Sequence, residues 1–151
     1  MAINPNTAFS SGAVFTADQA NRFPRGVMGY AEATANYLNF TAIGTVLTVT
    51  FTAVANRYYR ITYHEPQLFS NGAATNITMT IANGATALQQ SLTTGNTTYG
   101  VQGTAITVET FTAGSITVVG CAKSSSTTGA PTMVRDATRV ALLLVEDIGP
   151  A

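Results

Sequence analysis

The stretch LTVTFT at residues 47–52 is the sequence feature that most restricts the fold. Leu47, Val49 and Phe51 alternate with threonines, and residues 77–81 (ITMTI) repeat this alternation. A period of two places successive side chains on opposite faces of a β-strand. Both segments are therefore predicted to be half-buried strands with one apolar face and one hydroxyl-bearing face, because threonine suits an extended backbone.

The chain from Gly26 onward reads as strands and turns with almost no helix. Strands are expected at residues 26–34, 45–53, 56–66, 75–92 (as a hairpin), 99–111, 115–123 and 138–148, with a polar surface loop at 123–132. About eight short strands at this spacing are typical of an all-β, antiparallel β-sandwich or barrel, and that number favours a jelly-roll-like sandwich. The strand order stays open at this point.

Turn-forming residues mark the ends and irregularities of these strands. Asn83-Gly84 is predicted to be the centre of a two-residue hairpin turn, in which both residues have positive φ. Pro66 is expected to end its strand, and Gly103 is a candidate bulge position.

The apolar run ALLLV at residues 141–145 lies close to the end of the chain. Terminal residues are usually held loosely, so this run indicates that the C-terminal segment is built into the core. We interpret residues 142–145 as a strand buried on both faces, at a central position in a sheet. Gly149-Pro150 is then expected to release the chain.

Residues 1–25 lack the alternation and are expected to form a short non-strand N-terminal arm ahead of a sandwich domain at 26–151. Thr16 is a candidate N-cap for one helical turn, which Pro24 would stop. The candidate docking residues of the arm are Phe9, Phe15, Phe23, Pro24 and Arg25. Two alternatives remain, since such an arm either lies on its own domain or docks on a partner.

Charged residues are scarce, which restricts the classes of partner. Only 9% of the residues are charged, and seven basic residues balance seven acidic ones, whereas about 25% is usual. This composition lacks the basic surface of a nucleic-acid-binding protein and the polybasic segment of a membrane anchor. The sequence also shows no signal peptide and no apolar stretch near the roughly 20 residues of a membrane span. A polar, uncharged surface suits packing against copies of the chain or a larger body.

The residue types that catalysis or metal binding needs are sparse. His64 is the only histidine and Cys121 the only cysteine, so neither can join a histidine- or cysteine-rich metal site. His64 is expected to make a local hydrogen bond at a strand end, and Cys121 to be a small buried apolar residue. No spacing among the acids singles out a glycosidase-like pair, and Glu146 and Asp147 point to opposite faces of their strand. We therefore expect no catalytic residue, metal or cofactor.

A cluster of tyrosines and arginines is a candidate glycan contact. It consists of Tyr58, Tyr59, Arg60 and Tyr63, with Arg57 as a further candidate. Aromatic faces and guanidinium groups are useful in sugar binding. The simpler interpretation is that these are half-buried strand tyrosines with their hydroxyls at a wet edge.

Three phrases of the chain together resemble a known family. They are FTADQANRFPRGVMGYAEATAN (15–36), FTAVANRYYRITYHEP (51–66) and ALLLVEDIGPA (141–151). In them the chain is similar to small β-rich virion proteins and tail-fibre-like domains of tailed bacteriophages, especially those infecting actinobacteria. A stretch like MN-x-LPRGVVGYA opens that domain, and Phe23 replaces its usual Leu. Residues 68–108 match only in general character.

The resemblance implies a structural part of a phage particle, with a jelly-roll-like sandwich that forms a homotrimer. The matched motifs look structural, so no catalytic residue is carried over. Here the domain begins almost at the first residue, which favours a compact knob over the end of a long fibre. The implied location is the virion, after assembly in the host cytoplasm.

Three hypotheses for function follow. The first is a non-enzymatic virion surface protein, either a capsid decoration or minor capsid protein or a minor tail protein, which docks on major capsid or tail proteins through its arm. The second is a receptor- or glycan-binding module at the tail tip, which contacts a host-surface glycan. The third is an enzyme such as a wall-degrading hydrolase, which the scarcity of catalytic residue types disfavours. No nucleic-acid or membrane partner is expected.

Overall fold

The computed structural model describes residues 11–12, 14, 16–38, 40–70, 75–94, 100–126, 128 and 130–151. The described residues form one helix, α1 (Ala17–Asn21), and the strands β1 (Gly26–Ala33), β2 (Tyr37–Leu38), β3 (Gly44–Ala53), β4 (Arg57–Phe69), β5 (Asn76–Asn83), β6 (Thr86–Thr94), β7 (Val101–Thr110), β8 (Gly114–Ser124), β9 (Thr132–Met133) and β10 (Ala141–Pro150). The described part of the chain before β1 contains no strand, which confirms the non-strand arm there.

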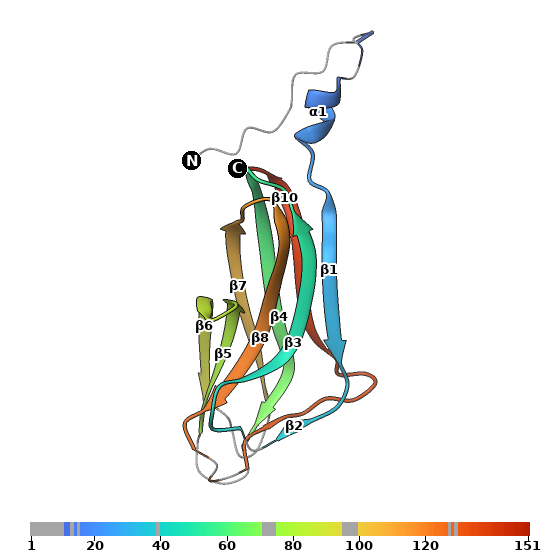
Figure 1. Cartoon of the computed structure of the whole chain (residues 1–151). Helices are drawn as coiled ribbons and strands as arrows, with labels where there is room; N and C mark the ends of the chain where they lie inside the picture. The colour runs from blue at the N-terminus through green and yellow to red at the C-terminus, as the bar shows by residue number, and fades with distance from the viewer. Residues whose placement is uncertain are drawn as a thin grey trace.

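The strands form two antiparallel sheets that pack face to face (Figure 1). The first sheet has the order β1-β10-β4-β9-β2, with β7 paired to β4, and the second has the order β3-β8-β5-β6. At the two open sides of the sandwich, β1 lies beside β3 and β7 lies beside β5 and β6. Chain neighbours such as β3 and β4 lie in different sheets, while β1 pairs with β10. This is the double-sheet arrangement of a jelly roll, so the predicted fold class is confirmed.

The core lies between the sheets and is built from alternate residues of each strand. Its large side chains with no exposed surface include Tyr59, Ile61, Tyr63, Ile77, Met79, Ile81, Leu143 and Val145. The residues between them face outward, as the period of two predicts. Full burial of a large apolar side chain contributes about 1.5–3 kcal/mol, so these residues hold the two sheets together.

The arm ends in a capped helical turn, as predicted from Thr16. The Thr16 hydroxyl accepts a hydrogen bond from Gln19 N–H at 3.2 Å, and Gln19 Oε1 accepts one from Thr16 N–H at 2.9 Å. These two bonds make a capping box, which satisfies amides that the helix leaves unpaired. The helix ends at Asn21, before Pro24 could stop it, and Arg22 forms its C-cap. It lies beyond the end of the sandwich at which β1 begins (Figure 1).

Pro66 does not end its strand, so that prediction was wrong. β10 pairs with β4 only as far as His64, and β9 pairs with it only from Leu68. The pairing with β7 also shifts register between Glu65 and Leu68. Proline has no N–H to donate. Pro66 lies where the pairing of β4 with its neighbouring strands is interrupted, so no ladder hydrogen bond is lost there. A bulge was predicted at Gly103 of β7. The pairing of β4 with β7 is irregular next to Gly103, but it is β4 that contains the additional residue.

The position of the last strand, β10, was predicted correctly, but its burial and its end were not. β10 lies between β1 and β4, which confirms the central position. Burial on both faces was wrong, since Leu142 and Leu144 are partly exposed while Leu143 and Val145 are fully buried. The strand also continues through Gly149-Pro150 instead of releasing the chain there.

The β5–β6 hairpin is confirmed, but its turn lies one residue later than predicted. Asn83 pairs with Thr86, so Gly84 and Ala85 are the central residues. Gly84 has φ +58°, whereas Asn83 and Ala85 are outside the positive-φ range. Only Gly84 therefore needs the left-handed conformation, which a residue with a Cβ adopts at a cost.

Replacing Gly84 with Ala is expected to lower the free energy of unfolding by about 1–2 kcal/mol, because alanine is strained in the left-handed region. The measurement is the urea midpoint at an unchanged slope. Gly84→Asn is the matched control, since asparagine tolerates this conformation, and it should retain most of the stability. Equal losses in both variants would show that the backbone conformation is not the cause.

Candidate interaction surfaces

A buried ion pair fixes the arm to the end of the sandwich. The side chains of Arg57 in β4 and Asp147 in β10 are only 5% and 0% exposed. The guanidinium donates to both carboxylate oxygens, from Nε to Oδ2 and from Nη2 to Oδ1, the latter at 2.8 Å. Its Nη1 and Nη2 also donate to the backbone carbonyls of Asn21 and Phe23, both at 2.6 Å. This group, which we call the Arg57 anchor, joins β4 and β10 to the segment between α1 and β1.

The backbone of β10 positions the carboxylate of this anchor. Asp147 follows Leu143 and Val145 on the inward face of its strand. A register shift after Asp147 then brings Gly149, with φ +122°, opposite Tyr58. The Gly149 N–H donates to Asp147 Oδ1 at 3.0 Å. The buried carboxylate thus receives hydrogen bonds from both the guanidinium and the backbone, which offsets the cost of removing it from water.

The structure places part of the predicted docking set. Phe9 and Phe15 lie outside the described residues. Phe23, Pro24 and Arg25 are exposed. The base of the arm is therefore held by its backbone carbonyls, while the side chains at positions 23–25 remain on the surface.

The predicted glycan cluster is divided between two faces of β4. Tyr59 and Tyr63 have no exposed surface and lie in the core, so their inclusion in a surface site was wrong. Arg57 is buried in the same inward-facing series. Tyr58 and Arg60 face outward, and only these two residues of the cluster have exposed surface.

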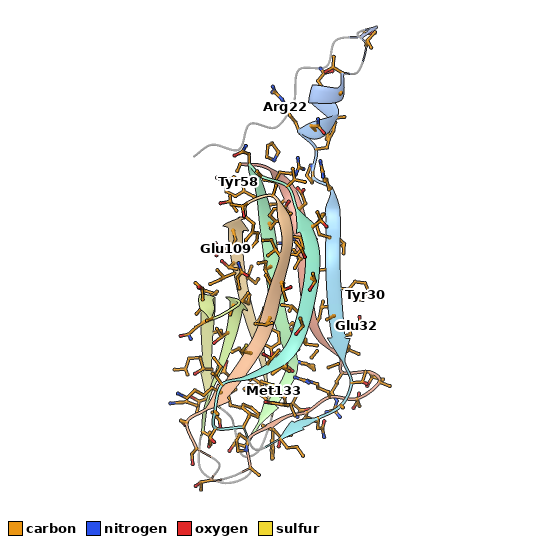
Figure 2. All side chains as sticks on the ribbon, viewed as in Figure 1. Arg22, Tyr30, Glu32, Tyr58, Glu109 and Met133 are labelled. Carbon is orange, nitrogen blue, oxygen red and sulfur yellow. The ribbon has the colours of Figure 1, made fainter. Side chains whose placement is uncertain are left out.

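The outward surface of β1, β10, β4 and β7 carries an apolar patch, which we call the outer face. Its large exposed apolar side chains are Val27 (59%), Tyr30 (64%), Ile106 (52%) and Val108 (50%). The strand register places Tyr30, Leu144, Thr62 and Ile106 in one row across the four strands. Tyr30 points away from the sandwich (Figure 2). Exposed apolar side chains grouped on one face make that face a candidate interaction site.

Two of the charged groups on the outer face form a pair, and a further carboxylate, Glu32 of β1, is exposed opposite Leu142. Arg60 Nε and Nη2 donate to Glu146 Oε2 at 2.9 and 2.7 Å. The opposite surface of the sandwich is different, since it presents hydroxyls on β3 and β8. There Thr50 Oγ1 lies 2.9 Å from Thr117 Oγ1. The outer surface of β3 and β8 is therefore rich in hydroxyls around Thr50 and Thr117.

A second buried ion pair lies at the other end of the core. Arg135 donates to both oxygens of Glu65, from Nε to Oε2 at 2.9 Å and from Nη2 to Oε1 at 2.6 Å. The Tyr63 hydroxyl donates to Glu65 Oε1 at 2.6 Å. Burial raises the pKa of Tyr63 far above its usual value, and the negative charge of Glu65 raises it further. The tyrosine therefore stays protonated as a donor. The backbone N–H of Arg135 donates to Asn36 Oδ1 at 2.7 Å, which links the loop before β10 to that before β2.

Most carboxylates of the described residues are engaged by arginines. Glu65, Asp136, Glu146 and Asp147 each form an ion pair. At the surface, hydrogen bonds from Arg139, and then from Thr138, hold the pKa of Asp136 well below its usual value.

His64 and Cys121 were predicted to have structural roles. His64 Nδ1 lies 3.0 Å from Thr104 Oγ1 on β7, which confirms a local hydrogen bond, although His64 is inside β4 and not at its end. Cys121 is buried, as predicted. Among the described residues no group of three or more His, Cys, Asp or Glu is placed to hold a metal ion. No helix in the described ranges is long and apolar enough to cross a membrane.

Two open depressions flank the turn between β3 and β4, at the end of the sandwich from which the arm leaves. One, of about 510 Å³, is lined by residues that include Arg22, Arg25 and Arg57. The other, of about 610 Å³, is lined by residues that include Tyr58 and Phe111. Both share the turn residues Ala55 and Asn56. Sequence reasoning missed this site because it depends on segments that are far apart along the chain.

No protein-family model matches the sequence, and no curated protein matches it. Among solved structures, the chain is similar to Eiger TNF from S. frugiperda, with 7% identity and a TM-score of 0.49 over 83% of this chain and 94% of that one. It is also similar to the CBM22-1 xylan-binding domain of Paenibacillus barcinonensis Xyn10C, with 10% identity and a TM-score of 0.36 over 82% and 88%. The third is a structure of infectious bursal disease virus Gt strain, with 14% identity and a TM-score of 0.40 over 98% and 41%. The strand order, and not these distant likenesses, defines the fold.

Proposed function

We propose that the chain is a non-enzymatic structural protein on the surface of a bacteriophage particle. It is a capsid decoration, minor capsid or minor tail protein, and it docks on a major capsid or tail protein through its N-terminal arm. The sandwich then faces away from the particle. The resemblance of three sequence phrases to phage virion proteins supports this proposal.

The Arg57 anchor is the observation that carries the proposal. Terminal segments are usually loose, whereas the base of this arm is held by a buried guanidinium through two backbone carbonyls. A force on the arm would be transmitted through Arg57 to β4 and β10. These are adjacent inner strands of the first sheet. The three phrases meet at this anchor, since the first supplies Asn21 and Phe23, the second Arg57 and the third Asp147.

Gold-labelled antibody against the chain, viewed on intact particles by electron microscopy, tests the location. Label over the head supports decoration, and label on the tail supports a minor tail protein. Particles without label would overturn the proposal.

A variant that lacks the residues before Pro24 tests the attachment. It is expected to fold, because it keeps every strand and the Arg57–Asp147 pair, but to lose binding to particles that lack the native protein. The full-length chain is the reference for binding, and circular dichroism checks the fold. Equal binding of both would contradict docking through the arm.

We further propose that the outer face joins copies of the chain, as a homotrimer. The large exposed apolar side chains of this face lie on β1 and β7, and the Arg60–Glu146 pair between these strands adds no net charge. Closed rings of identical subunits are a common way to cover such a surface.

Replacing Tyr30 with Glu is expected to convert the trimer into a monomer, because each contact would have to bury an unpaired carboxylate. Light scattering coupled to size exclusion should show three times the chain mass of 15.7 kDa for the native protein and the single mass for the variant. Thr50→Glu, on the hydroxyl-bearing surface, is the matched control and should stay trimeric. A native protein that is monomeric at all concentrations would contradict this proposal.

A receptor- or glycan-binding role at a tail tip is the second candidate. Tyr58 and Phe111 both line the larger depression, so it offers two aromatic residues to a sugar. Binding of the purified protein to host cell-wall glycans, lost in Tyr58→Ala, would favour this candidate. The absence of detectable binding would count against it.

A further inference from the structure

We propose that the homotrimer is a ring in which the β1 border of the outer face of one copy contacts the β7 border of the next copy. Each copy contributes two different borders, and the same contact occurs three times. This inference rests on the homotrimer proposed above and identifies the residues at which two copies meet. The β1 border is defined by Val27, Tyr30 and Glu32, and the β7 border by Thr104, Ile106 and Val108.

The large exposed apolar side chains of the outer face lie at its two borders and not at its centre. Val27 and Tyr30 are on β1, and Ile106 and Val108 are on β7. β10 and β4 lie between these two strands (Figure 1). Three strand spacings, or about 14 Å, therefore separate the borders. Within one chain the two apolar groups cannot cover each other, whereas those of two neighbouring copies can.

The strand register divides the outer face into rows that run from one border to the other. The three rows are Val27, Glu146, Arg60 and Val108; Tyr30, Leu144, Thr62 and Ile106; and Glu32, Leu142, His64 and Thr104. A rotation about an axis parallel to the strands keeps each residue at its height along that axis. Copies related by such a rotation therefore bring together the two ends of the same row.

The two ends of each row are complementary. Val27 of one copy would contact Val108 of the next, and Tyr30 would contact Ile106. All four side chains are at least half exposed in the single chain, so both contacts remove apolar surface from water, which favours association.

The third row pairs an acid with a histidine and a hydroxyl. Glu32 is exposed, points away from the sandwich as Tyr30 does (Figure 2), and forms no ion pair within the described part of the chain. At the other end of the row, His64 Nδ1 lies 3.0 Å from Thr104 Oγ1. If the Thr104 hydroxyl donates to Nδ1, the neutral ring carries its proton on Nε2. That N–H can then donate to Glu32 of the next copy.

The direction of the arm selects the axis of the ring. The arm leaves the sandwich at the end where β1 begins (Figure 1). Copies around an axis parallel to the strands have their arms at the same end, where all of them can reach one particle. An axis perpendicular to the strands would direct the arms of two copies to opposite ends and would bring different rows together. The docking role therefore favours an axis parallel to the strands, and the homotrimer makes it a three-fold axis.

Disulfide cross-linking of the full-length chain tests this contact. All variants carry Cys121→Ala, which removes the only native thiol. After oxidation, Tyr30→Cys/Ile106→Cys should run on a non-reducing gel at three times the chain mass of 15.7 kDa. A bond within one chain is excluded, because a disulfide needs Cα atoms within about 7 Å. Each single variant should stay at one chain mass.

A mismatched pair of positions is the control for the rows. Val27→Cys/Val108→Cys lies within one row and should also give the three-chain product. Val27→Cys/Thr104→Cys joins the same borders two rows apart. The β10 residues of these rows, Glu146 and Leu142, are four positions apart, which is about 13 Å along the strand. The mismatched pair should give less than about a tenth of the cross-linked product.

Exchange of charge tests the third row independently. Glu32→Lys should raise the concentration at which half of the trimer dissociates by about tenfold, because the ring repeats the lost contact three times. Glu32→Lys/Thr104→Glu restores opposite charges across the same contact and should return this concentration to the native value. Thr50→Lys, on the other sheet, is the control and should have no effect. Sedimentation equilibrium measures all four chains.

Several outcomes would overturn the ring. Linked pairs of chains from Tyr30→Cys alone would show that β1 contacts β1. Cross-linking of Tyr30→Cys/Ile106→Cys that stops at two chains would assign the borders to a face-to-face dimer, and equal products from matched and mismatched pairs would contradict the rows. A native trimer whose matched pairs fail to cross-link overturns this inference alone. A monomeric native chain overturns the homotrimer itself, and particles without gold label overturn the proposed virion role.

Discussion

Replacing Arg57 with Leu should lower the free energy of unfolding by about 3–5 kcal/mol, the usual cost of removing one partner of a buried ion pair. Asp147 would remain buried without its guanidinium, and the carbonyls of Asn21 and Phe23 would lose their donors. For a chain of this size the melting temperature should fall by about 10 °C. Differential scanning calorimetry at neutral pH measures both quantities.

Arg60→Leu is the matched control for this experiment. Arg60 lies three residues further along β4 and also pairs with a carboxylate, but its side chain is 49% exposed. A surface ion pair contributes about 0–1 kcal/mol, so this variant should be nearly as stable as the native chain. The double variant Arg57→Leu/Asp147→Leu removes both buried charges and should recover most of the loss. Equal losses for Arg57 and Arg60 would show that burial does not decide the effect.

Replacing Leu143 with Ala should cost about 2–5 kcal/mol, because it removes transfer free energy and leaves a cavity in the core. Leu143 has no exposed surface and lies in β10, next to Tyr63 of β4 in the sheet register. Denaturation in urea should show a lower midpoint at an unchanged slope.

Leu142→Ala is the control from the same apolar run. Its side chain is on the outer face and partly exposed, so water or the neighbouring surface can occupy part of the vacated space. The expected loss is below that of Leu143→Ala. A loss at Leu142 as large as that at Leu143 would indicate that the outer face is covered in solution, and the comparison should then be repeated in Tyr30→Glu.

The period of two was enough to predict the core of the long strands. Leu47, Val49 and Phe51 are buried and Thr48, Thr50 and Thr52 are exposed, because each half-buried strand has only one way to face the core. The alternation could not predict the burial of the run ALLLV. Apolar residues occupy both faces of this strand, so the pattern does not show which face is outward. It also failed at Pro66, because a bulge depends on the neighbouring strands and these were unknown.

The interaction surfaces were predicted less well than the fold. The alternation already placed Arg57 and Glu65 on the same face as Tyr59 and Tyr63, and a charged residue in a buried series requires a partner. That signal could have indicated two buried ion pairs. It could not identify Arg135 or Asp147 as the partners, because their pairing depends on strand order and on the path of a loop. The outer face required the register of four strands, which no local pattern gives.

Cys121 provides a direct probe of motion at the outer surface of the second sheet. It is the only cysteine in the chain, and its position on β8 places it opposite Thr45 of β3 and Thr80 of β5. Cys121 is 7% exposed and lines a depression on the outer surface of this sheet with Ile43, Thr80 and Val119, so a thiol reagent can react when these covering side chains move aside. The rate of labelling therefore measures the free energy of that local opening at one residue, without any engineered label. Comparing this rate in the native chain and in Arg57→Leu would show whether loosening the arm end reaches the centre of the other sheet.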